Sequence, residues 1–178
     1  MKERGYIHVY TGNGKGKTSS CIGLTIRSLG AGYKVFFSQF MKNGEYSEIK
    51  ALRLIGEKVF SGQLELHQYG LKGKLFQKPD EKDRIAAEEG LQKVTEASIS
   101  GSYDLVVLDE VNIALQQGLL KENDILDLMQ NKHINTELVL SGRYASDKII
   151  EKADLVSKID SLKHYAQTGV RARLGIEK

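Results

Sequence analysis

The residues best suited to chemistry form a glycine-rich segment near the start of the chain, residues 11–18, which reads T-G-N-G-K-G-K-T. Its three glycines carry no Cβ and adopt positive φ readily, so successive backbone N–H groups can turn toward one anion. Lys17 would add a positive charge near the outer phosphates of a nucleotide, and the Thr18 hydroxyl is a hard oxygen ligand suited to Mg²⁺. The segment predicts a phosphate-binding loop, although the pattern G-x-x-x-x-G-K-[ST] would have glycine in place of Thr11.

The segments on both sides of this loop have the patterns that a phosphate-binding loop needs. An apolar, β-branched-rich run at residues 6–10 precedes it, and Ile22, Ile26 and Leu29 follow it with helical spacing. A strand, a glycine loop and a helix in that order bring the positive end of the helix dipole to the bound anion. The alternative is a glycine-rich turn with solvated lysines, and the flanking patterns favour the nucleotide loop.

A second polar cluster follows another apolar run. Residues 105–108 form a short continuous apolar stretch, typical of a strand buried on both faces of a parallel sheet, and Asp109 and Glu110 come directly after it. Open α/β sheets bind ligands at the carboxyl ends of their strands. Asp109 could therefore hold Mg²⁺, directly or through water, and Glu110 could orient a nucleophile. Acidic residues in the first turn of the next helix stay an alternative, because the helix dipole favours them.

The elements that must position these residues alternate between strand and helix. Strands are expected near residues 6–10, 34–39, 64–68, 105–108, 137–141 and 155–159, and helices near 17–29, 47–55, 80–98, 112–116, 123–131 and 146–152. The alternation predicts right-handed crossovers and a mostly parallel sheet with helices on both faces. The segments 11–18, 39–42, 109–110 and 142–143 would then share one edge of the sheet as a ligand site.

Length and composition set the broad class. The chain has 178 residues, which suits one domain over 1–178, and its 40% of hydrophobic residues is ordinary for a globular protein. No apolar run approaches the ~20 residues that span a bilayer, and residues 1–5 contain no signal segment. A net charge of +3 does not indicate a nucleic-acid partner. The single cysteine, Cys21, excludes an internal disulfide, so we expect a cytoplasmic protein.

Six segments, in order, resemble the P-loop ATP:corrinoid adenosyltransferase family. They are T-G-N-G-K-G-K-T at 11–18, Q-F-M-K at 39–42, V-L-D-E-V-N at 107–112, S-G-R at 141–143, E-K-A-D-L-V at 151–156 and K-H-Y-A-Q-T-G-V-R-A-R-L-G-I-E at 163–177. The last is the most diagnostic. The resemblance implies a RecA-like P-loop α/β fold. It also implies an enzyme of cobalamin biosynthesis that transfers the 5′-deoxyadenosyl group of ATP to the Co(I) of a reduced corrinoid, releasing triphosphate and forming adenosylcobalamin.

The resemblance also implies the site. Cobalt is itself the nucleophile, so no side-chain nucleophile is implied, and Lys15, Lys17 and Mg²⁺ (or Mn²⁺) would stabilise charge on the leaving triphosphate. The loop would bind the triphosphate in the reverse direction relative to ordinary ATPases. Thr18 and Asp109 would be the metal ligands, and Arg27 has a surface position on the helix as an alternative. The implied nucleotide-binding residues are Thr11, Gly12, Asn13, Gly14, Lys15, Gly16, Lys17, Thr18, Ser19, Arg27, Glu110 and Arg143.

The corrinoid half of the site departs from the family pattern. Family members carry a G-F-T-W segment before the long helix, where residues 69–76 here read Y-G-L-K-G-K-L-F, and the chain has no tryptophan. Phe76 or Tyr69 would substitute for the missing aromatics, and His164 would line the site. The resemblance further implies a homodimer and a reductase or other electron donor as partner. Many members have an N-terminal helix that covers the partner's site, so the short segment 1–5 predicts a less covered site.

The residues are also compatible with two other functions. An ordinary P-loop ATPase or kinase would use Glu110 to position water or an acceptor hydroxyl and would release phosphate or ADP. A non-catalytic module that binds ATP or a corrinoid is the second, and the missing aromatic segment favours it. The leaving group, triphosphate or ADP, separates the transferase from the ATPase or kinase.

Overall fold

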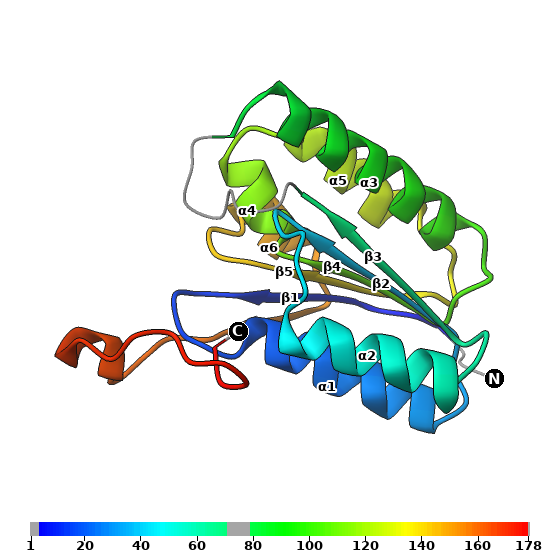
Figure 1. The fold of residues 1–178 in the computed structure, drawn as a ribbon. Coiled ribbons are helices and arrows are strands. Elements are labelled where there is room, and N and C mark those ends of the chain that lie inside the picture. Colours follow the sequence, from blue (N-terminus) through cyan, green and yellow to red (C-terminus); the bar gives the residue numbers. More distant parts are fainter. Residues whose placement is uncertain (1–3, 71–78, 178) are drawn as a thin grey trace.

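The computed structural model describes residues 4–70 and 79–177, and a six-stranded sheet lies at its centre (Figure 1). The strands are β1 (Ile7–Thr11), β2 (Val35–Phe40), β3 (Leu64–Tyr69), β4 (Leu105–Asp109), β5 (Glu137–Ser141) and β6 (Leu155–Lys158). Their order is β3-β2-β4-β5-β1-β6, and every neighbouring pair is parallel. The predicted parallel sheet is confirmed, and each predicted strand end lies within one residue of the observed one.

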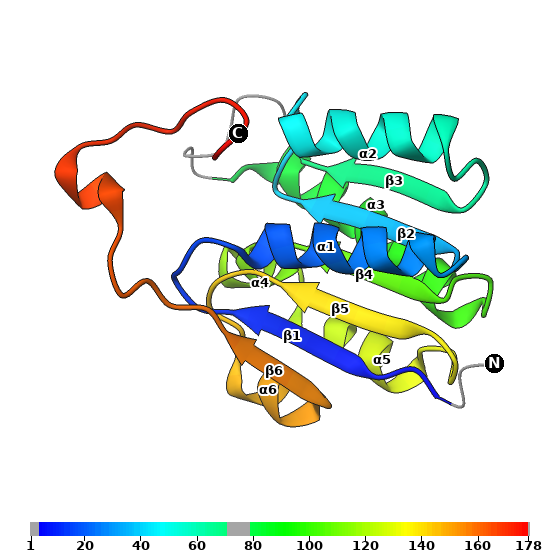
Figure 2. The same cartoon turned by 90° about the horizontal axis from the view of Figure 1, so that it is seen from below.

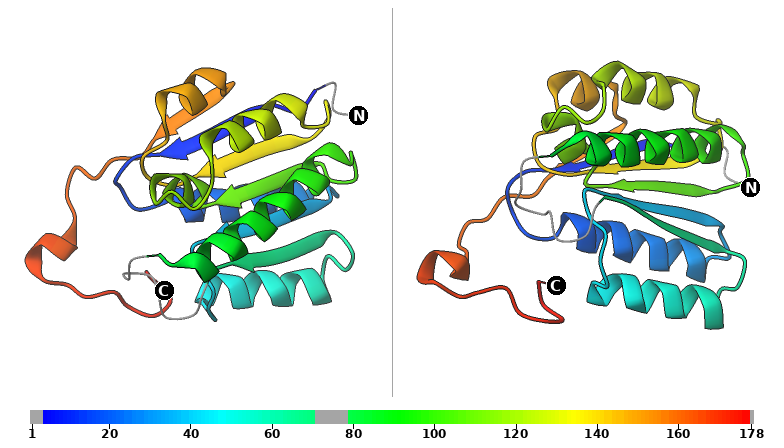
Figure 3. Two further views of the ribbon diagram at one scale, coloured as in Figure 1. Left: turned by 90° about the horizontal axis from the view of Figure 1, so that it is seen from above. Right: turned by 45° about the horizontal axis from the view of Figure 1, so that its top comes forward.

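Helices cover both faces of the sheet (Figure 2). On one face lie α1 (Lys17–Gly30) and α2 (Ser47–Lys58), and on the other lie α3 (Glu81–Ile99), α4 (Val111–Gln116), α5 (Glu122–Asn131) and α6 (Asp147–Lys152). Figure 3 shows α3, α5 and α6 above the strands. This is the two-faced α/β architecture that the alternating sequence predicted.

Alternating side chains along the strands build one apolar core on each face. Val106 and Leu138 belong to the core under α3 and α5, whereas Val107 and Val139 belong to the core that also contains α1 and α2. Because both faces are covered, β4 is buried over its whole length. Its last residue is therefore carried to the carboxyl edge of the sheet by a rigid, fully packed strand.

A long C-terminal tail follows β6. Residues 159–177 extend away from the sheet, contain one 3₁₀ turn, η1 (Tyr165–Thr168), and return so that the C-terminus lies close to the start of α1 and α2 (Figures 1 and 2). Most of these residues are exposed. Their return places the end of the chain over the carboxyl edge of the sheet.

Across residues 4–70 and 79–177, no helix combines the length and apolarity that crossing a membrane requires.

Candidate nucleotide site

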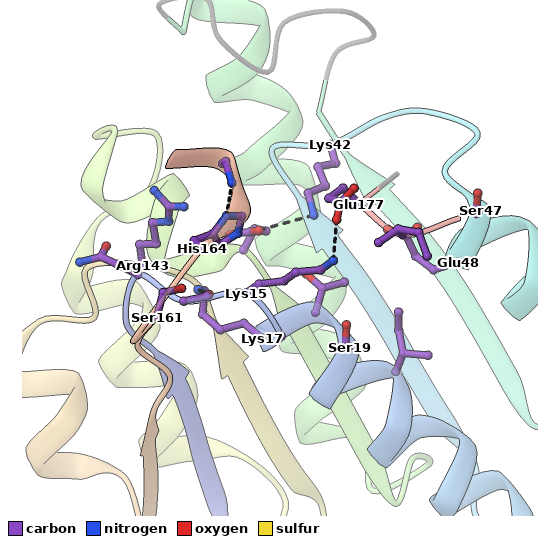
Figure 4. Close-up of a pocket in the computed structure, with 18 of the residues that line it drawn as sticks. Lys15, Lys17, Ser19, Lys42, Ser47, Glu48, Arg143, Ser161, His164 and Glu177 are labelled. Atoms are coloured by element: carbon purple, nitrogen blue, oxygen red, sulfur yellow. Dashed lines mark hydrogen bonds and ion pairs between the residues drawn. The ribbon is translucent and has the colours of Figure 1, made fainter. Parts of the chain in front are cut away.

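A pocket of about 830 Å³ lies at the carboxyl ends of the strands. The glycine loop and the first turn of α1 form one wall, and the segments after β2, β4 and β5 and the C-terminal tail form the rest (Figure 4). Residues 13–19, Glu110, Arg143 and His164, all predicted for the site, line this pocket. The structure thus brings together residues from both ends of the sequence.

The glycines of the loop are required for two reasons, a positive φ and close packing against another segment. Gly12 and Gly16 have φ of 97° and 127°, the positive values that the sequence predicted. A Cβ on Gly12 would lie 2.5 Å from the carbonyl oxygen of Ile159, and one on Gly14 would lie 2.8 Å from the same atom. Gly14 N–H also donates to that oxygen at 2.7 Å. At positions 12 and 14 glycine is therefore also required by close packing against the backbone that follows β6.

Lys17 folds back over the loop. Its ammonium donates to the carbonyl oxygens of Gly12 at 2.7 Å and Gly14 at 2.8 Å, and the residue is only 7% exposed. Burial lowers the pKa of Lys17. The side chain therefore sets a desolvated positive charge at the centre of the loop. A bound polyphosphate would give this ammonium a charged hydrogen-bond partner in place of the two neutral carbonyl oxygens.

Lys15 joins the loop to the C-terminal tail. Its ammonium donates to Glu177 Oε1 at 2.8 Å and to the Tyr165 hydroxyl at 3.0 Å, and Arg173 Nη2 lies 3.3 Å from the same carboxylate. Hydrogen bonds from Arg173, Lys15 and Tyr165 lower the pKa of Glu177 well below its usual range. The pKa of Lys15 is raised by its bonds to Glu177 and Tyr165. This contact was not predicted from the sequence, where the charged, family-like end of the tail was its one signal.

Asp109 is the buried centre of the site. Its carboxylate accepts both Thr18 Oγ1, at 3.0 and 3.1 Å, and Gln39 Nε2 at 2.9 Å, and Ser141 Oγ donates to it at 2.5 Å. Gln68 Nε2 donates in turn to Gln39 Oε1 at 2.9 Å. The predicted metal ligands Thr18 and Asp109 are thus in direct contact. The sequence predicted that segment 39–42 lies at the site but gave Gln39 itself no role, and Ser141 was noted only within the family-like segment 141–143.

Glu110 is the N-cap residue of α4, and its carbonyl oxygen accepts the N–H groups of Ile113 and Ala114. It is the residue before α4, has φ of 62°, and makes no side-chain hydrogen bond to the helix end. Its carboxylate lines the pocket, with Lys42 Nζ 3.5 Å from Oε1. The alternative interpretation, a strand end followed by an acidic residue at the start of the next helix, fits the position of Glu110 at the N-terminus of α4, and the contacts of both carboxylates at the pocket are an additional feature.

Residues with strained backbone conformations lie at the carboxyl edge of the sheet. In the described part of the chain, the non-glycine residues with positive φ are Met41, Glu110 and Tyr144, at 61°, 62° and 64°. They follow the ends of β2, β4 and β5 within three residues. Such conformations cost of order 1–3 kcal/mol each and concentrate at functional sites. Their positions support a site at the carboxyl edge independently of the side chains.

The donor set around Thr18 suits a hard divalent cation. A hydroxyl and two carboxylates offer only oxygen, which Mg²⁺ prefers. Within residues 4–70 and 79–177 no cluster of three or more His, Cys, Asp or Glu could enclose a metal. Such an ion would take its remaining ligands from water and phosphate, which is how Mg²⁺ accompanies nucleotides.

Comparison with known proteins agrees with this geometry. The family model for ATP:corrinoid adenosyltransferase BtuR/CobO/CobP matches residues 3–177. A corrinoid adenosyltransferase from Pseudomonas aeruginosa is 35% identical, over 98% of this chain and 84% of that protein. Another, from Escherichia coli K12, is 30% identical over 98% of this chain and 86% of its own length.

The chain belongs to the ATP:corrinoid adenosyltransferase family. The two relatives described above are named corrinoid adenosyltransferases, so the chain belongs with the enzymes that transfer alkyl groups. Two solved structures share the fold at low identity. A KaiC-like protein from Pyrococcus horikoshii has a TM-score of 0.63 at 15% identity, over 90% of this chain and 75% of that one. The flagellar accessory protein FlaH from Methanocaldococcus jannaschii has 0.58 at 16%, over 87% and 71%. The predicted P-loop α/β fold is confirmed.

Three of the nucleotide-binding residues predicted from the family resemblance, Thr11, Gly12 and Arg27, do not line the pocket. Arg27 is exposed in the last turn of α1, and ten residues of helix place it about 15 Å along the axis from Lys17. The alternative of a surface position fits this location. Thr11 ends β1 and is buried, and its hydroxyl accepts Ala145 N–H at 3.3 Å. We interpret Thr11 as a link between the loop and the segment after β5.

The aromatic residues expected to replace the family's G-F-T-W segment have different positions. Phe76 lies outside the described residues. Tyr69 packs beneath α3, where a Cβ on Gly90 would lie 2.4 Å from its ring, and its buried hydroxyl has no hydrogen-bond partner among the described residues. Burial raises the pKa of Tyr69 to about 12. Tyr69 therefore packs against the core under α3 and does not line the pocket, and its role as a replacement for a corrinoid-pocket aromatic stays a prediction.

Proposed function

We propose that this protein transfers the 5′-deoxyadenosyl group of ATP to the Co(I) centre of a reduced corrinoid, with triphosphate as the leaving group, as a step in cobalamin biosynthesis. Family membership supports adenosyl transfer to a corrinoid. The observation that carries the proposal is the contact of Thr18 with Asp109 beside Lys17, in a pocket large enough for a nucleotide.

Bond changes in this reaction are few. A Co–C5′ bond forms with the electron pair of Co(I), and the C5′–O bond breaks with its pair leaving on the triphosphate. No protein nucleophile or base is needed, so the protein must orient the two substrates and stabilise negative charge on the departing oxygens.

The cations at the loop suit this charge stabilisation. Lys17 lies over the loop, Lys15 lines the same wall, and Arg143 approaches from the segment after β5. Thr18 and Asp109, with Glu110 nearby, would hold Mg²⁺ or Mn²⁺ on the phosphates. Asn13, Gly14, Gly16 and Ser19 would complete the nucleotide contacts, and the reversed triphosphate direction stays part of the proposal.

The corrinoid would enter from the side of the C-terminal tail. His164 lines the pocket there, and its Nδ1 accepts Ala166 N–H at 3.0 Å, which fixes the ring at the start of η1. We retain His164 and Phe76 as corrinoid contacts. A homodimer, an electron donor such as a reductase, and a cytoplasmic location, which suits the single Cys21, complete the proposal.

The test is to incubate the protein with ATP, Mg²⁺ and chemically reduced cobalamin under anaerobic conditions. We expect a light-sensitive Co–C product and one triphosphate released per product. Release of ADP or phosphate without that product would identify an ATPase or kinase instead. Tight ATP binding with neither product would identify a binding module.

A further inference from the structure

Lys42 lies at the end of the pocket where Asp109 and Glu110 place their carboxylates. Its Nζ lies 3.5 Å from Glu110 Oε1 and 4.0 Å from Asp109 Oδ2, and its side chain is only 16% exposed. Figure 4 shows it pointing into the pocket that Lys15 and Lys17 also line. An ammonium so placed neutralises part of the charge of both carboxylates.

The backbone that carries Lys42 is fixed. Met41 takes φ of 61° directly after β2, and its N–H donates to Tyr69 O at 3.0 Å. Asn43 Nδ2 donates to Gly70 O at 2.9 Å, and a Cβ on Gly70 would lie 2.7 Å from Lys42 N. Because the chain on both sides is tied to the end of β3, the ammonium stays within reach of the acidic pair.

Lys42 and a divalent cation would compete for the same carboxylates. The Thr18 hydroxyl is bonded to Asp109, so a cation between them would lie beside the oxygen that Lys42 faces. Two like charges a few ångströms apart in a partly desolvated site repel strongly. Phosphates could relieve this repulsion, because a triphosphate in the pocket offers the ammonium a new partner.

We propose that Lys42 is a positioning residue that acts as the counter-ion of Asp109 and Glu110 before nucleotide binds, and that it disfavours metal binding until the phosphates of ATP draw its ammonium away. The metal would then enter with the nucleotide rather than ahead of it. The inference rests on the proposed function only in taking Thr18 and Asp109 as the metal site.

The experiment measures Mn²⁺ binding by electron paramagnetic resonance, with and without ATP, for the wild type and three variants. Lys42→Met removes the charge while keeping much of the chain, Lys42→Arg keeps the charge, and Lys50→Met, on the exposed face of α2, is the control. We expect Lys42→Met to bind Mn²⁺ without ATP roughly tenfold more tightly. The factor by which ATP enhances Mn²⁺ affinity should shrink correspondingly, by linkage. Lys42→Arg and Lys50→Met should match the wild type.

Unchanged or weaker Mn²⁺ binding by Lys42→Met, while the wild type binds Mn²⁺ with ATP, would overturn the role of Lys42 alone. A wild type that binds no Mn²⁺ even with ATP would overturn the proposed metal site as well. Thermal unfolding of each variant checks folding, and Lys42→Gln supplies a second charge-removing substitution if the methionine variant is unstable.

Discussion

At the scale of single residues, the buried carboxylate of Asp109 explains why several elements must meet. A fully buried charged or polar group is costly unless hydrogen bonds compensate it. Thr18, Gln39 and Ser141 supply those bonds from α1, β2 and β5. The hydrogen bonds to Asp109 therefore organise the site in the absence of a ligand.

Lys17 should carry much of the triphosphate affinity. Lys17→Met removes the charge at the centre of the loop, where charge-assisted hydrogen bonds contribute about 1.5–3 kcal/mol. We expect ATP binding to weaken by roughly 10- to 150-fold, measured by titration calorimetry. Lys50→Met, remote and exposed, should leave the affinity unchanged. An affinity within a factor of two of the wild type would show that Lys17 does not contact the phosphates.

Glu177 should oppose nucleotide binding, because it holds the ammonium of Lys15 that phosphate would need. Glu177→Gln keeps the shape and removes the competing negative charge. Because ion pairs at the protein surface are weak, we expect only a modest effect, with ATP bound up to roughly fivefold more tightly. The comparison is made by calorimetry at fixed ionic strength. Weaker binding by the glutamine variant would mean that Glu177 positions Lys15 for the phosphate instead.

At the scale of elements, the glycine loop depends on the chain that leaves β6. Gly12 and Gly14 pack against the backbone of Ile159, and Gly14 donates a hydrogen bond to it. The loop is thus held from behind by a segment almost 150 residues away in sequence, while its other side opens to the pocket. This support fixes the loop before any ligand is present.

Gly14→Ala should separate these two segments. Its Cβ would lie 2.8 Å from backbone atoms of Ile159 and Asp160, which cannot rotate away. Overpacking of this kind costs about 1–3 kcal/mol, measured as the free energy of unfolding in urea. Gly23→Ala in α1, where a Cβ meets nothing within 4 Å, is the matched control and should stabilise by up to about 1 kcal/mol. Equal effects of the two substitutions would remove the argument for tight packing.

At the scale of the whole molecule, the carboxyl edge of one sheet is enclosed by the two ends of the chain. The loop comes from residues 11–18, and the tail that covers it contributes Glu177. Tail residues are mostly exposed, so few apolar contacts hold them. Their attachment therefore depends on the charged cluster of Lys15, Tyr165, Arg173 and Glu177.

Acid should release this tail. The pKa of Glu177 is depressed in the folded protein, so its stabilisation is complete above the ordinary glutamate pKa of about 4.3 and is lost as the pH falls through the depressed value. We expect ¹⁵N relaxation to show rising mobility of residues 164–177 below about pH 4, with the sheet unchanged. Glu177→Gln should show that mobility already at neutral pH. A tail that stays rigid in the glutamine variant would contradict this role for the cluster.

Local patterns were enough to predict the elements and the nature of the site. Apolar runs such as residues 105–108, and glycines beside helical spacing, act over a few neighbouring positions, so they can be interpreted without the rest of the chain. The contacts of Gln39 and Ser141 with Asp109 could not be predicted in this way. The two side chains contact Asp109 only because β2 and β5 flank β4, and strand order is a property of the sheet.

Taken by itself, the sequence determined an α/β protein with a nucleotide loop, an acidic strand end and the family to which both belong, because periodicity and short motifs are local. Tertiary structure alone decided that Glu177 holds Lys15, that Lys42 faces the acidic pair, and that Ile159 crowds Gly12 and Gly14. It also decided that Tyr69 packs against the core under α3. These contacts join residues distant in sequence, and only the packed sheet with its returning tail brings them within bonding distance.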